Sequence, residues 1–199
     1  MIQFESNPFV HTLAYQVGKK GTVYCGDSYF IKATNEYFIC VVADGLGSGE
    51  MAYMSSAAIS RVVENHHEDN VQSLMERCNT VVKDKRGATV SILKVEFTNK
   101  QFVYSSVGNI VFVLYSPSGK FIYPLPILGY LSGKPQKYRT QSYSYEKGSK
   151  FILYTDGLKA PSVKSLLKDF HTIEDISNHL EAYTRKRDDD LTYIVGQLL

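Results

Sequence analysis

Four aspartates in this chain stand within or next to apolar, strand-like segments. Asp44 and Asp156 each follow such a segment directly, Asp189 comes just before a third, and Asp27 lies inside a fourth. An aspartate at the end of a strand is commonly a turn former. Asp44, however, is followed by a helical pattern and Asp156 by a segment that contains proline. Neither residue therefore makes a tight hairpin, and a chemical role becomes the alternative.

Carboxylates gathered at one end of a fold repel one another, and this repulsion predicts a cation. Two unit charges about 5 Å apart cost roughly 3 kcal/mol at an effective dielectric constant near 20. Divalent ions would remove that cost, and oxygen ligands without His or Cys favour a hard ion. The four aspartates therefore predict a Mg²⁺ or Mn²⁺ site.

The glycine-rich loop after Asp44 raises a nucleotide site as an alternative. Its sequence, Asp44-Gly45-Leu46-Gly47-Ser48-Gly49, has the spacing GxGxG. This spacing matches neither the phosphate loop GxxxxGK[ST] nor the dinucleotide motif GxGxxG, and the second strand–helix unit of a dinucleotide fold is missing. We expect these glycines instead to let the backbone turn sharply and to expose the Gly45 carbonyl as another oxygen ligand.

Other chemistries find little support in the composition. The three cysteines form no CxxC pair, which argues against a disulfide framework and a zinc site. The 22 Lys and Arg nearly balance the 20 Asp and Glu and are scattered, so we expect no nucleic-acid partner. His66-His67 ends a predicted helix, where a positive charge is favoured; a metal role is the alternative.

The elements that must position the aspartates follow from hydrophobic periodicity. The predicted strands are 9–17, 24–31, 37–43, 88–97, 101–106, 110–116, 120–123, 137–145, 151–154 and 191–199. The predicted helices are 48–66, 70–83, 162–170 and 173–186, with Asn70 as the cap of the second. Met51, Met54 and Met75 are predicted core residues. Strands in hairpin order with helices in two blocks favour antiparallel sheets. We predict an α+β fold, a four-layer αββα sandwich of two antiparallel sheets flanked by helices.

The chain length predicts one domain, residues 1–199. No run of apolar residues is long enough to span a membrane, and the N-terminus does not have the pattern of a secretory signal. We expect a cytoplasmic monomer without a membrane partner.

The aspartates fall within six short motifs whose order resembles the PPM family of metal-dependent Ser/Thr protein phosphatases. The motifs are Gly26-Asp27, Val42-Ala43-Asp44-Gly45-Leu46-Gly47, Gly87-Ala88-Thr89, Ser106-Val107-Gly108-Asn109, Thr155-Asp156-Gly157 and Asp189-Asp190-Leu191-Thr192. The resemblance runs from about Asp27 to Gly196 and is greatest to the small bacterial, SpoIIE-like branch. Within that branch, the segment from Pro124 to Tyr138 is similar to the stress-response phosphoserine phosphatases of Bacillus-type bacteria.

The resemblance implies a centre with two Mn²⁺ or Mg²⁺ ions at one end of the sandwich. Asp44 would bridge both ions, Asp156 and Asp189 would complete the shell of one, and Asp27 and the Gly45 carbonyl would serve the other. Asp44, Asp156 and Asp189 are thereby the expected catalytic residues. The ions would activate a water for attack on phosphorus, so that no protein nucleophile is needed.

The chain departs from the family pattern at several positions. Leu46 stands where many relatives have a His that can protonate the leaving group. Only Lys19 and Lys20 lie near the place of a phosphate-gripping Arg, Gly26 replaces a Glu, and Asp190 replaces an Asn. These departures leave the metal carboxylates untouched but remove the familiar proton donor.

Three supporting roles stay open. Asn109 either forms a turn or orders the loop that faces the metals. Thr192 either orients Asp189 or is an ordinary strand residue. Asp188 or Asp190 caps or hydrogen-bonds locally.

The function that follows is a Mg²⁺- or Mn²⁺-dependent phosphatase for phosphoserine or phosphothreonine in proteins. No insertion encloses the site, which suits a folded protein better than a metabolite. The resemblance implies phosphorylated stressosome scaffold and antagonist proteins as substrates and a role in resetting the stress signal. The alternatives are a catalytically inactive binding module of the same fold and a small-phosphomonoester hydrolase.

Overall fold

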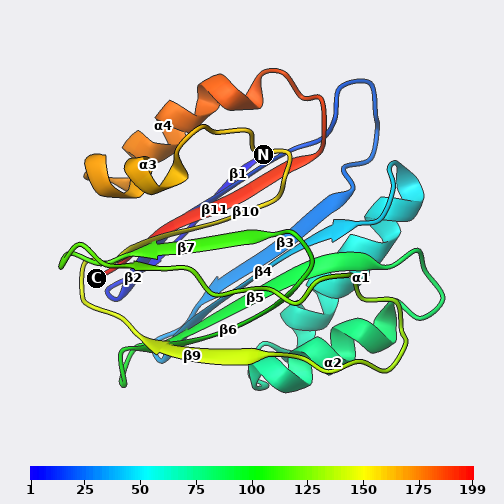
Figure 1. Ribbon diagram of the computed structural model, residues 1–199, viewed down its shortest axis with the longest axis horizontal. Coiled ribbons are helices and arrows are strands. Elements are labelled where there is room, and N and C mark those ends of the chain that lie inside the picture. The colour runs from blue at the N-terminus through cyan, green and yellow to red at the C-terminus, as the bar shows by residue number, and fades with distance from the viewer.

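The computed structural model describes residues 1–199, and its strands form two antiparallel sheets that lie face to face (Figure 1). One sheet has the strand order β1-β2-β11-β10-β7-β8 and the other the order β3-β4-β5-β6-β9. The elements are β1 (Ile2–Asn7), β2 (Val10–Val17), β3 (Asp27–Ala33), β4 (Tyr37–Gly45), α1 (Glu50–His66), α2 (Val71–Val81), β5 (Ala88–Glu96), β6 (Gln101–Val107), β7 (Val111–Tyr115), β8 (Phe121–Ile122), β9 (Thr140–Ser144), β10 (Lys150–Tyr154), α3 (Val163–Asp169), α4 (Ile173–Thr184) and β11 (Leu191–Leu198).

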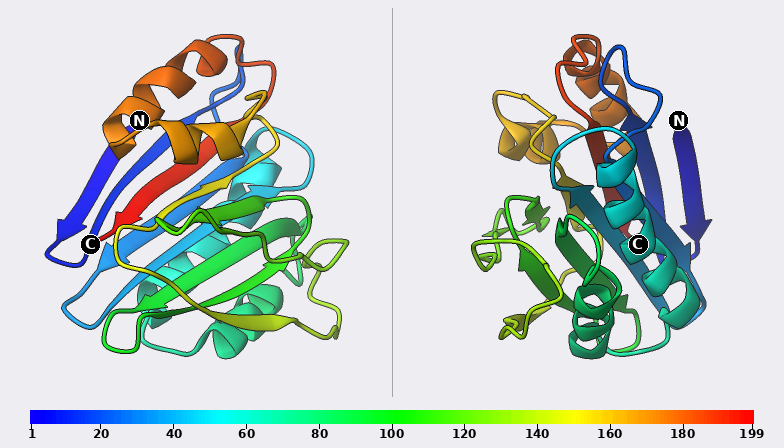
Figure 2. Two further views of the ribbon diagram at one scale, coloured as in Figure 1. Left: turned by 60° about the vertical axis from the view of Figure 1, so that its left-hand side comes forward. Right: turned by 90° about the vertical axis from the view of Figure 1, so that its right-hand side faces the viewer.

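The helices cover the outer faces of the two sheets (Figure 2). Helices α1 and α2 pack on the five-stranded sheet, and α3 and α4 pack on the six-stranded sheet. The predicted αββα sandwich is confirmed. Asn70 caps α2 as predicted, because its side chain accepts a hydrogen bond from the Ser73 amide.

Alternation along β4 explains how the layers pack. Phe38 and Val42 belong to the apolar cluster between the sheets, whereas Ile39 and Val41 belong to the cluster beneath α1 and α2. Successive side chains of a strand point to opposite faces, and because both faces of β4 are covered, its sequence is a continuous apolar run. Asp44 follows Val42 by two residues, so its side chain is directed to the space between the sheets.

Two of the three predicted core methionines are at the surface. Met75 is fully buried, but Met51 and Met54 are 46% and 47% exposed, so their prediction as core residues is wrong. The cause is the close approach of α1 to the sheet. A Cβ on Gly45 would lie 1.9 Å from the carbonyl oxygen of Ala52, and at that separation only small side chains fit beneath the first turn of α1.

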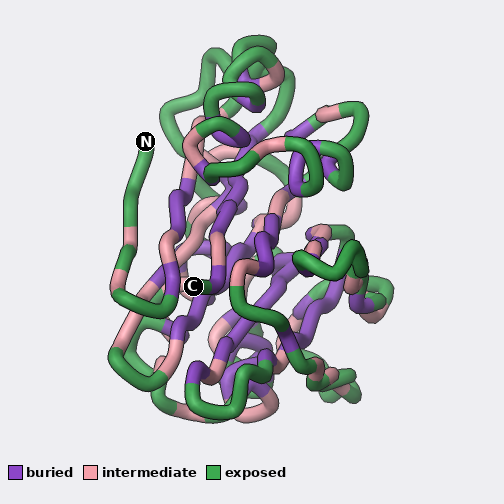
Figure 3. The backbone as a smooth tube through the Cα atoms, turned by 90° about the vertical axis from the view of Figure 1, so that its left-hand side faces the viewer, coloured by how far each residue is buried: buried purple, intermediate pink, exposed green.

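Strand β1 lies outside the predicted elements. It is an edge strand that pairs only with β2, and most of its residues are exposed (Figure 3). Exposure on both faces removes the alternation by which a strand is recognised in a sequence. The turn between β1 and β2 is held by Asn7, whose side chain accepts hydrogen bonds from the amides of Phe9 and Val10.

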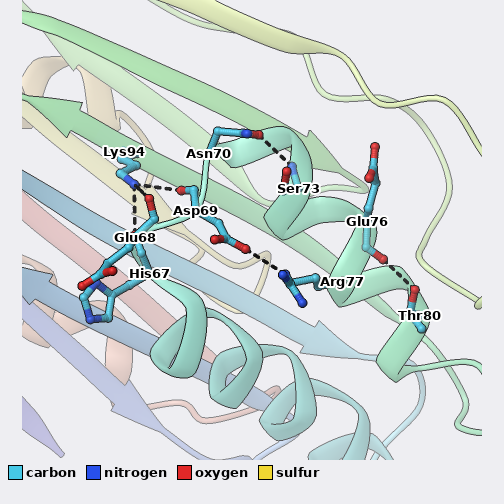
Figure 4. Close-up of polar contacts among 9 residues, drawn as sticks. All are labelled: His67, Glu68, Asp69, Asn70, Ser73, Glu76, Arg77, Thr80 and Lys94. Carbon is cyan, nitrogen blue, oxygen red and sulfur yellow. Dashed lines mark hydrogen bonds and ion pairs between the residues drawn. The ribbon is translucent and has the colours of Figure 1, made fainter.

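The positive charge at the end of α1 comes from Lys94 of β5. The Lys94 ammonium donates hydrogen bonds to the carbonyl oxygens of His67, Glu68 and Asp69 at 3.0, 2.9 and 2.8 Å (Figure 4). These carbonyls belong to the C-cap residue of α1 and to the two residues that follow it. Lys94 is only 9% exposed, so the turn between α1 and α2 is closed over a buried cation.

His67 therefore has neither of the roles considered for it. Its ring nitrogens hydrogen-bond to the Lys32 ammonium at 2.7 Å and to the Tyr37 hydroxyl at 2.6 Å. Burial and the nearby Lys32 charge lower the pKa of His67. The ring is thus a neutral structural group rather than the cation at the helix end or a metal ligand.

None of the four helices combines the length and the apolar character needed to cross a membrane.

Candidate metal centre

Asp27 and Asp44 face each other across two neighbouring strands. Asp27 begins β3, Asp44 is the penultimate residue of β4, and the two are paired residues in the antiparallel register. Asp27 is 2% exposed, and Oδ2 of its carboxylate accepts a hydrogen bond of 2.8 Å from the Thr155 hydroxyl. A buried carboxylate is thus held at the end of the five-stranded sheet by a residue of the other sheet.

Asp156 and Asp189 come from the corresponding end of the six-stranded sheet. Asp156 follows β10 and Asp189 precedes β11, and these strands are antiparallel neighbours. Both carboxylates belong to exposed residues. The Asn109 side chain donates a hydrogen bond of 2.9 Å to Oδ2 of Asp156, so of its two open roles the ordering of this loop is confirmed.

Asp44 is electrostatically coupled to each of the other three aspartates. Burial, and then the charges of Asp156, Asp189 and Asp190, raise the pKa of Asp44 to about 7. Burial, and then the charge of Asp44, raise the pKa of Asp27 well above its ordinary value. The protein itself provides no cation that removes this repulsion. The residues of both sheets that the sequence singles out are therefore brought together, at a cost that a divalent ion would offset.

The donor set fits hard divalent ions, because it consists of oxygen atoms. Cys25 is the thiol nearest to it, and burial together with the charges of Asp27 and Asp190 raise its pKa, which keeps the sulfur protonated. No three His, Cys, Asp or Glu side chains lie close enough together to hold a metal ion by themselves. Backbone carbonyls and water would have to supply part of each shell, as is usual for Mg²⁺.

Gly45 is a glycine because α1 lies against it. A Cβ at this position would clash with the Ala52 carbonyl. The Gly45 amide donates a hydrogen bond of 3.0 Å to the Gly26 carbonyl. Gly45 also pairs with Ala88 of β5. The backbone beside Asp44 is thus fixed from three sides, which is a property required of a carbonyl ligand.

Asp190 ties the loops of the site together. Its Oδ1 accepts a hydrogen bond from the Lys19 amide at 2.9 Å, and its Oδ2 accepts one from the Gly26 amide at 2.8 Å. A Cβ on Gly26 would lie 2.7 Å from that same Oδ2. The local capping role considered for Asp190 is therefore wrong, because its partners are more than 160 residues away along the chain.

The threonines support Asp27. Hydrogen bonds from Thr155 and Thr192 favour the charged form of Asp27, although burial outweighs them in its pKa. Thr192 accepts a hydrogen bond of 3.2 Å from the Gln16 side chain, so the orientation of Asp189 considered for it is not what the structure shows. Sequence reasoning missed Thr155, whose signal was its place one residue before Asp156 at the buried end of β10.

Three basic residues belong to the loops next to the site. Lys19 and Lys20 are exposed, in the loop held by Asp190. Arg86 lies over the glycine loop after Asp44: a Cβ on Gly47 would be 2.5 Å from Nη1 of Arg86. Leu46 is half-buried in that loop, and its amide donates to the Gly87 carbonyl. The hydrocarbon side chain of Leu46 has no proton to donate to a leaving group.

The carboxylates lie on an open rim and not in a deep cavity. A hollow of about 600 Å³ lies between α2 and residues 133–138 and contains none of the four aspartates. The carboxylate cluster, and not this hollow, is the candidate site, because only the cluster combines buried charge with several oxygen donors.

Known proteins are similar to this chain in sequence and in fold. The family described as Stage II sporulation protein E (SpoIIE) matches residues 34–198. The phosphoserine phosphatase RsbX of Bacillus subtilis (strain 168) is 59% identical over 198 residues, which cover 100% of both chains.

Solved structures agree with these matches. A crystal structure of RsbX in complex with magnesium superimposes with a TM-score of 0.97 at 58% identity, covering 100% of both chains. A structure from work on the bacterial stressosome has a TM-score of 0.85 at 25% identity and covers 94% of this chain and 99% of its own. The catalytic domain of the serine/threonine phosphatase PstP with two manganese ions, at 15% identity and a TM-score of 0.77 over 96% and 99% of the two chains, shares the fold.

Proposed function

Because this chain belongs to the SpoIIE family of PPM-type phosphatases, we propose that it is a Mg²⁺- or Mn²⁺-dependent protein phosphatase that acts on phosphoserine and phosphothreonine. The observation that supports the proposal is that Asp44, paired with Asp27 across β3 and β4, has its pKa raised to about 7 by burial and then by the charges of Asp156, Asp189 and Asp190. A fold keeps such repulsion where it serves to bind cations.

The residues divide into ion holders and supports. Asp44 would be shared by two ions. Asp156 and Asp189 would complete the shell of one ion, and Asp27 and the Gly45 carbonyl would complete that of the other. When bound, such ions activate a water and neutralise the charge on the phosphoryl oxygens. Asn109 donates a hydrogen bond to Asp156, and Thr155 donates one to Asp27; these bonds would orient the two carboxylates toward the ions.

The reaction needs no nucleophile from the protein. A water oxygen forms a bond to phosphorus as the bond from phosphorus to the serine oxygen breaks, and serine and inorganic phosphate leave. The raised pKa of the Cys25 thiol keeps the sulfur protonated, so it is not a thiolate nucleophile. Leu46 has no proton to give to the leaving group. We infer that the serine oxygen takes its proton from water, which an open rim admits.

A phosphorylated protein fits this rim better than a metabolite. Asp156 and Asp189 are exposed, and a small ligand is normally held in an enclosing pocket. RsbX is a phosphoserine phosphatase and a further similar structure comes from work on the stressosome. We infer that this chain dephosphorylates stressosome scaffold and antagonist proteins and resets their signal.

The test is hydrolysis of p-nitrophenyl phosphate and of a phosphoserine protein with Mn²⁺ or Mg²⁺. We expect activity that needs the metal, is abolished by excess EDTA and falls by more than a hundredfold in Asp44→Asn. Activity that persists in EDTA or in Asp44→Asn would refute the metal mechanism. A protein that binds phosphoprotein without hydrolysing either substrate would be an inactive binding module, and a strong preference for metabolites would indicate a small-phosphomonoester hydrolase.

A further inference from the structure

The connection between β8 and β9 exposes two large apolar side chains beside the carboxylates. Residues 123–139 contain no helix or strand of their own, and in Figure 2 this yellow-green segment projects from the body of the molecule. Leu128 is 90% exposed and Tyr130 is 47% exposed. We call residues 128–130 the Leu128 ledge.

Backbone hydrogen bonds hold the ledge at both ends. Before it, the Ile127 amide donates to the Ser106 carbonyl at 2.9 Å, and the Ile127 carbonyl accepts from the Gly108 amide at 2.8 Å. After it, Leu131 and Ala88 exchange two hydrogen bonds of 3.1 and 2.8 Å. Only three residues separate these anchors, so Leu128 is presented by a fixed support.

One end of the ledge lies beside the loop that holds Asp156. A Cβ on Gly108 would be 3.3 Å from the Gly129 carbonyl oxygen. The next residue, Asn109, donates the hydrogen bond to Asp156. The ledge therefore adjoins the part of the rim that comes from the six-stranded sheet.

The other end lies beside the loop that follows Asp44. A Cβ on Gly87 would be 3.0 Å from the Tyr130 ring. The Gly87 carbonyl accepts a hydrogen bond of 3.0 Å from the Leu46 amide, two residues beyond Asp44. The ledge thus runs along the rim from one group of carboxylates to the other.

We propose that the Leu128 ledge docks an apolar side chain close to the phosphoserine on the surface of a folded protein substrate. This inference rests on the proposed function, since the phosphoryl group must reach the carboxylates while the surface around it covers the rim. A fixed, exposed leucine on that rim then loses its contact with water, which favours binding. A small phosphomonoester at the carboxylates would not extend over the ledge.

The test compares Leu128→Ser with the unaltered protein on two substrates. The probes are a phosphoserine-containing stressosome scaffold protein and p-nitrophenyl phosphate, both with saturating Mn²⁺. We expect kcat/KM for the phosphoprotein to fall about tenfold, chiefly through KM, and that for p-nitrophenyl phosphate to change less than twofold. Leu128→Ile keeps the apolar contact and should stay within about twofold of the unaltered protein on both substrates.

Leu125→Ser is the matched control, because Leu125 is an exposed leucine of the same connection whose carbonyl is bonded to Gln141 of β9. It should leave both substrates unaffected. An unchanged kcat/KM of Leu128→Ser for the phosphoprotein overturns the proposal, and so does an equal loss on both substrates, which indicates a structural effect. Dimerisation of the unaltered protein that is lost in Leu128→Ser without a change in phosphoprotein kinetics assigns the ledge to a second copy.

Failure of the proposed function gives a different result. The unaltered protein would then show no metal-dependent hydrolysis of p-nitrophenyl phosphate. If it hydrolyses that compound but leaves the phosphoprotein intact and unbound, the chemistry stands and the ledge proposal falls.

Discussion

The Thr155 hydroxyl donates a hydrogen bond of 2.8 Å to Oδ2 of Asp27, and this bond joins the two sheets at the end where the carboxylates meet. The same hydroxyl oxygen accepts from the Thr192 amide at 3.0 Å. Asp27 is therefore oriented by the six-stranded sheet although it belongs to the other one. The Thr155 side chain thus couples the relative position of the sheets to the geometry of the site.

Thr155→Val should weaken metal binding because it removes that bond and keeps the shape of the side chain. We expect the affinity for Mn²⁺, measured by titration calorimetry, and the hydrolysis of p-nitrophenyl phosphate at limiting Mn²⁺ to fall roughly tenfold or more. Thr155→Ser keeps both hydrogen bonds and should restore most of the affinity. Equal metal affinity in Thr155→Val and the unaltered protein would contradict this role.

Asp44→Asn should stabilise the metal-free protein while it abolishes activity. The substitution removes a charge that repels Asp27, Asp156 and Asp189, so the free energy of unfolding in EDTA should rise by about 2 kcal/mol at pH 7.5. Urea denaturation measures this difference. With saturating Mn²⁺ the order should reverse, because the unaltered protein then gains binding free energy. A less stable Asp44→Asn in EDTA would show that the carboxylates do not repel.

The stability of the metal-free protein should fall as the pH rises from about 4 to 7. The pKa values of Asp27 and Asp44 are raised in the folded state, that of Asp44 to about 7. Between their ordinary pKa and the raised one, the unfolded chain has lost these protons and the folded chain still holds them, so stability declines with pH. Chemical denaturation in EDTA at several pH values measures this slope.

The control for the pH slope is Asp44→Asn, which removes the largest interaction on Asp27 after burial. The difference in unfolding free energy between the two proteins isolates the contribution of the site from that of the other titrating groups. This difference should change by about 2 kcal/mol between pH 4 and 7, a figure already reduced for the part of Asp44 that faces water. A stability difference that does not depend on pH would refute the raised pKa of Asp44.

Much of the fold was predictable because β4, β5 and α2 have strong periodic patterns and because Asn70 is a regular cap. The carboxylates were predictable as a set, since Asp44, Asp156 and Asp189 stand at the ends of apolar strands; Asp27 was predicted inside a strand, whereas it begins β3. Met51 and Met54 were not, because helical periodicity does not reveal how close α1 lies to Gly45. The roles of Thr155 and Asp190 depend on residues more than 120 positions away, and spacing along the chain does not report such contacts.

Lys94→Met should destabilise the protein without changing the chemistry of the site. Three carbonyls of the turn that follows α1 lose a charged donor, and we expect the free energy of unfolding to fall by about 3 kcal/mol. Lys32→Met, which removes a neighbouring ammonium from His67, is the control and should cost less than about 1 kcal/mol. At a temperature where the variant is folded, its kcat for p-nitrophenyl phosphate should equal that of the unaltered protein; a lower kcat would link this turn to the site.

Asp190→Ala should loosen the loop before β3 and thereby weaken metal binding. Asp190 accepts from the amides of Lys19 and Gly26, and the Gly26 amide directly precedes Asp27. We expect the affinity for Mn²⁺ to fall about tenfold to a hundredfold and amide hydrogen exchange of residues 18–27 to become faster. Asp188→Ala, at an exposed position two residues away, should change neither quantity. If the affinity fell while exchange of residues 18–27 stayed the same, Asp190 would be acting on the ion directly, and its role in holding this loop would be refuted.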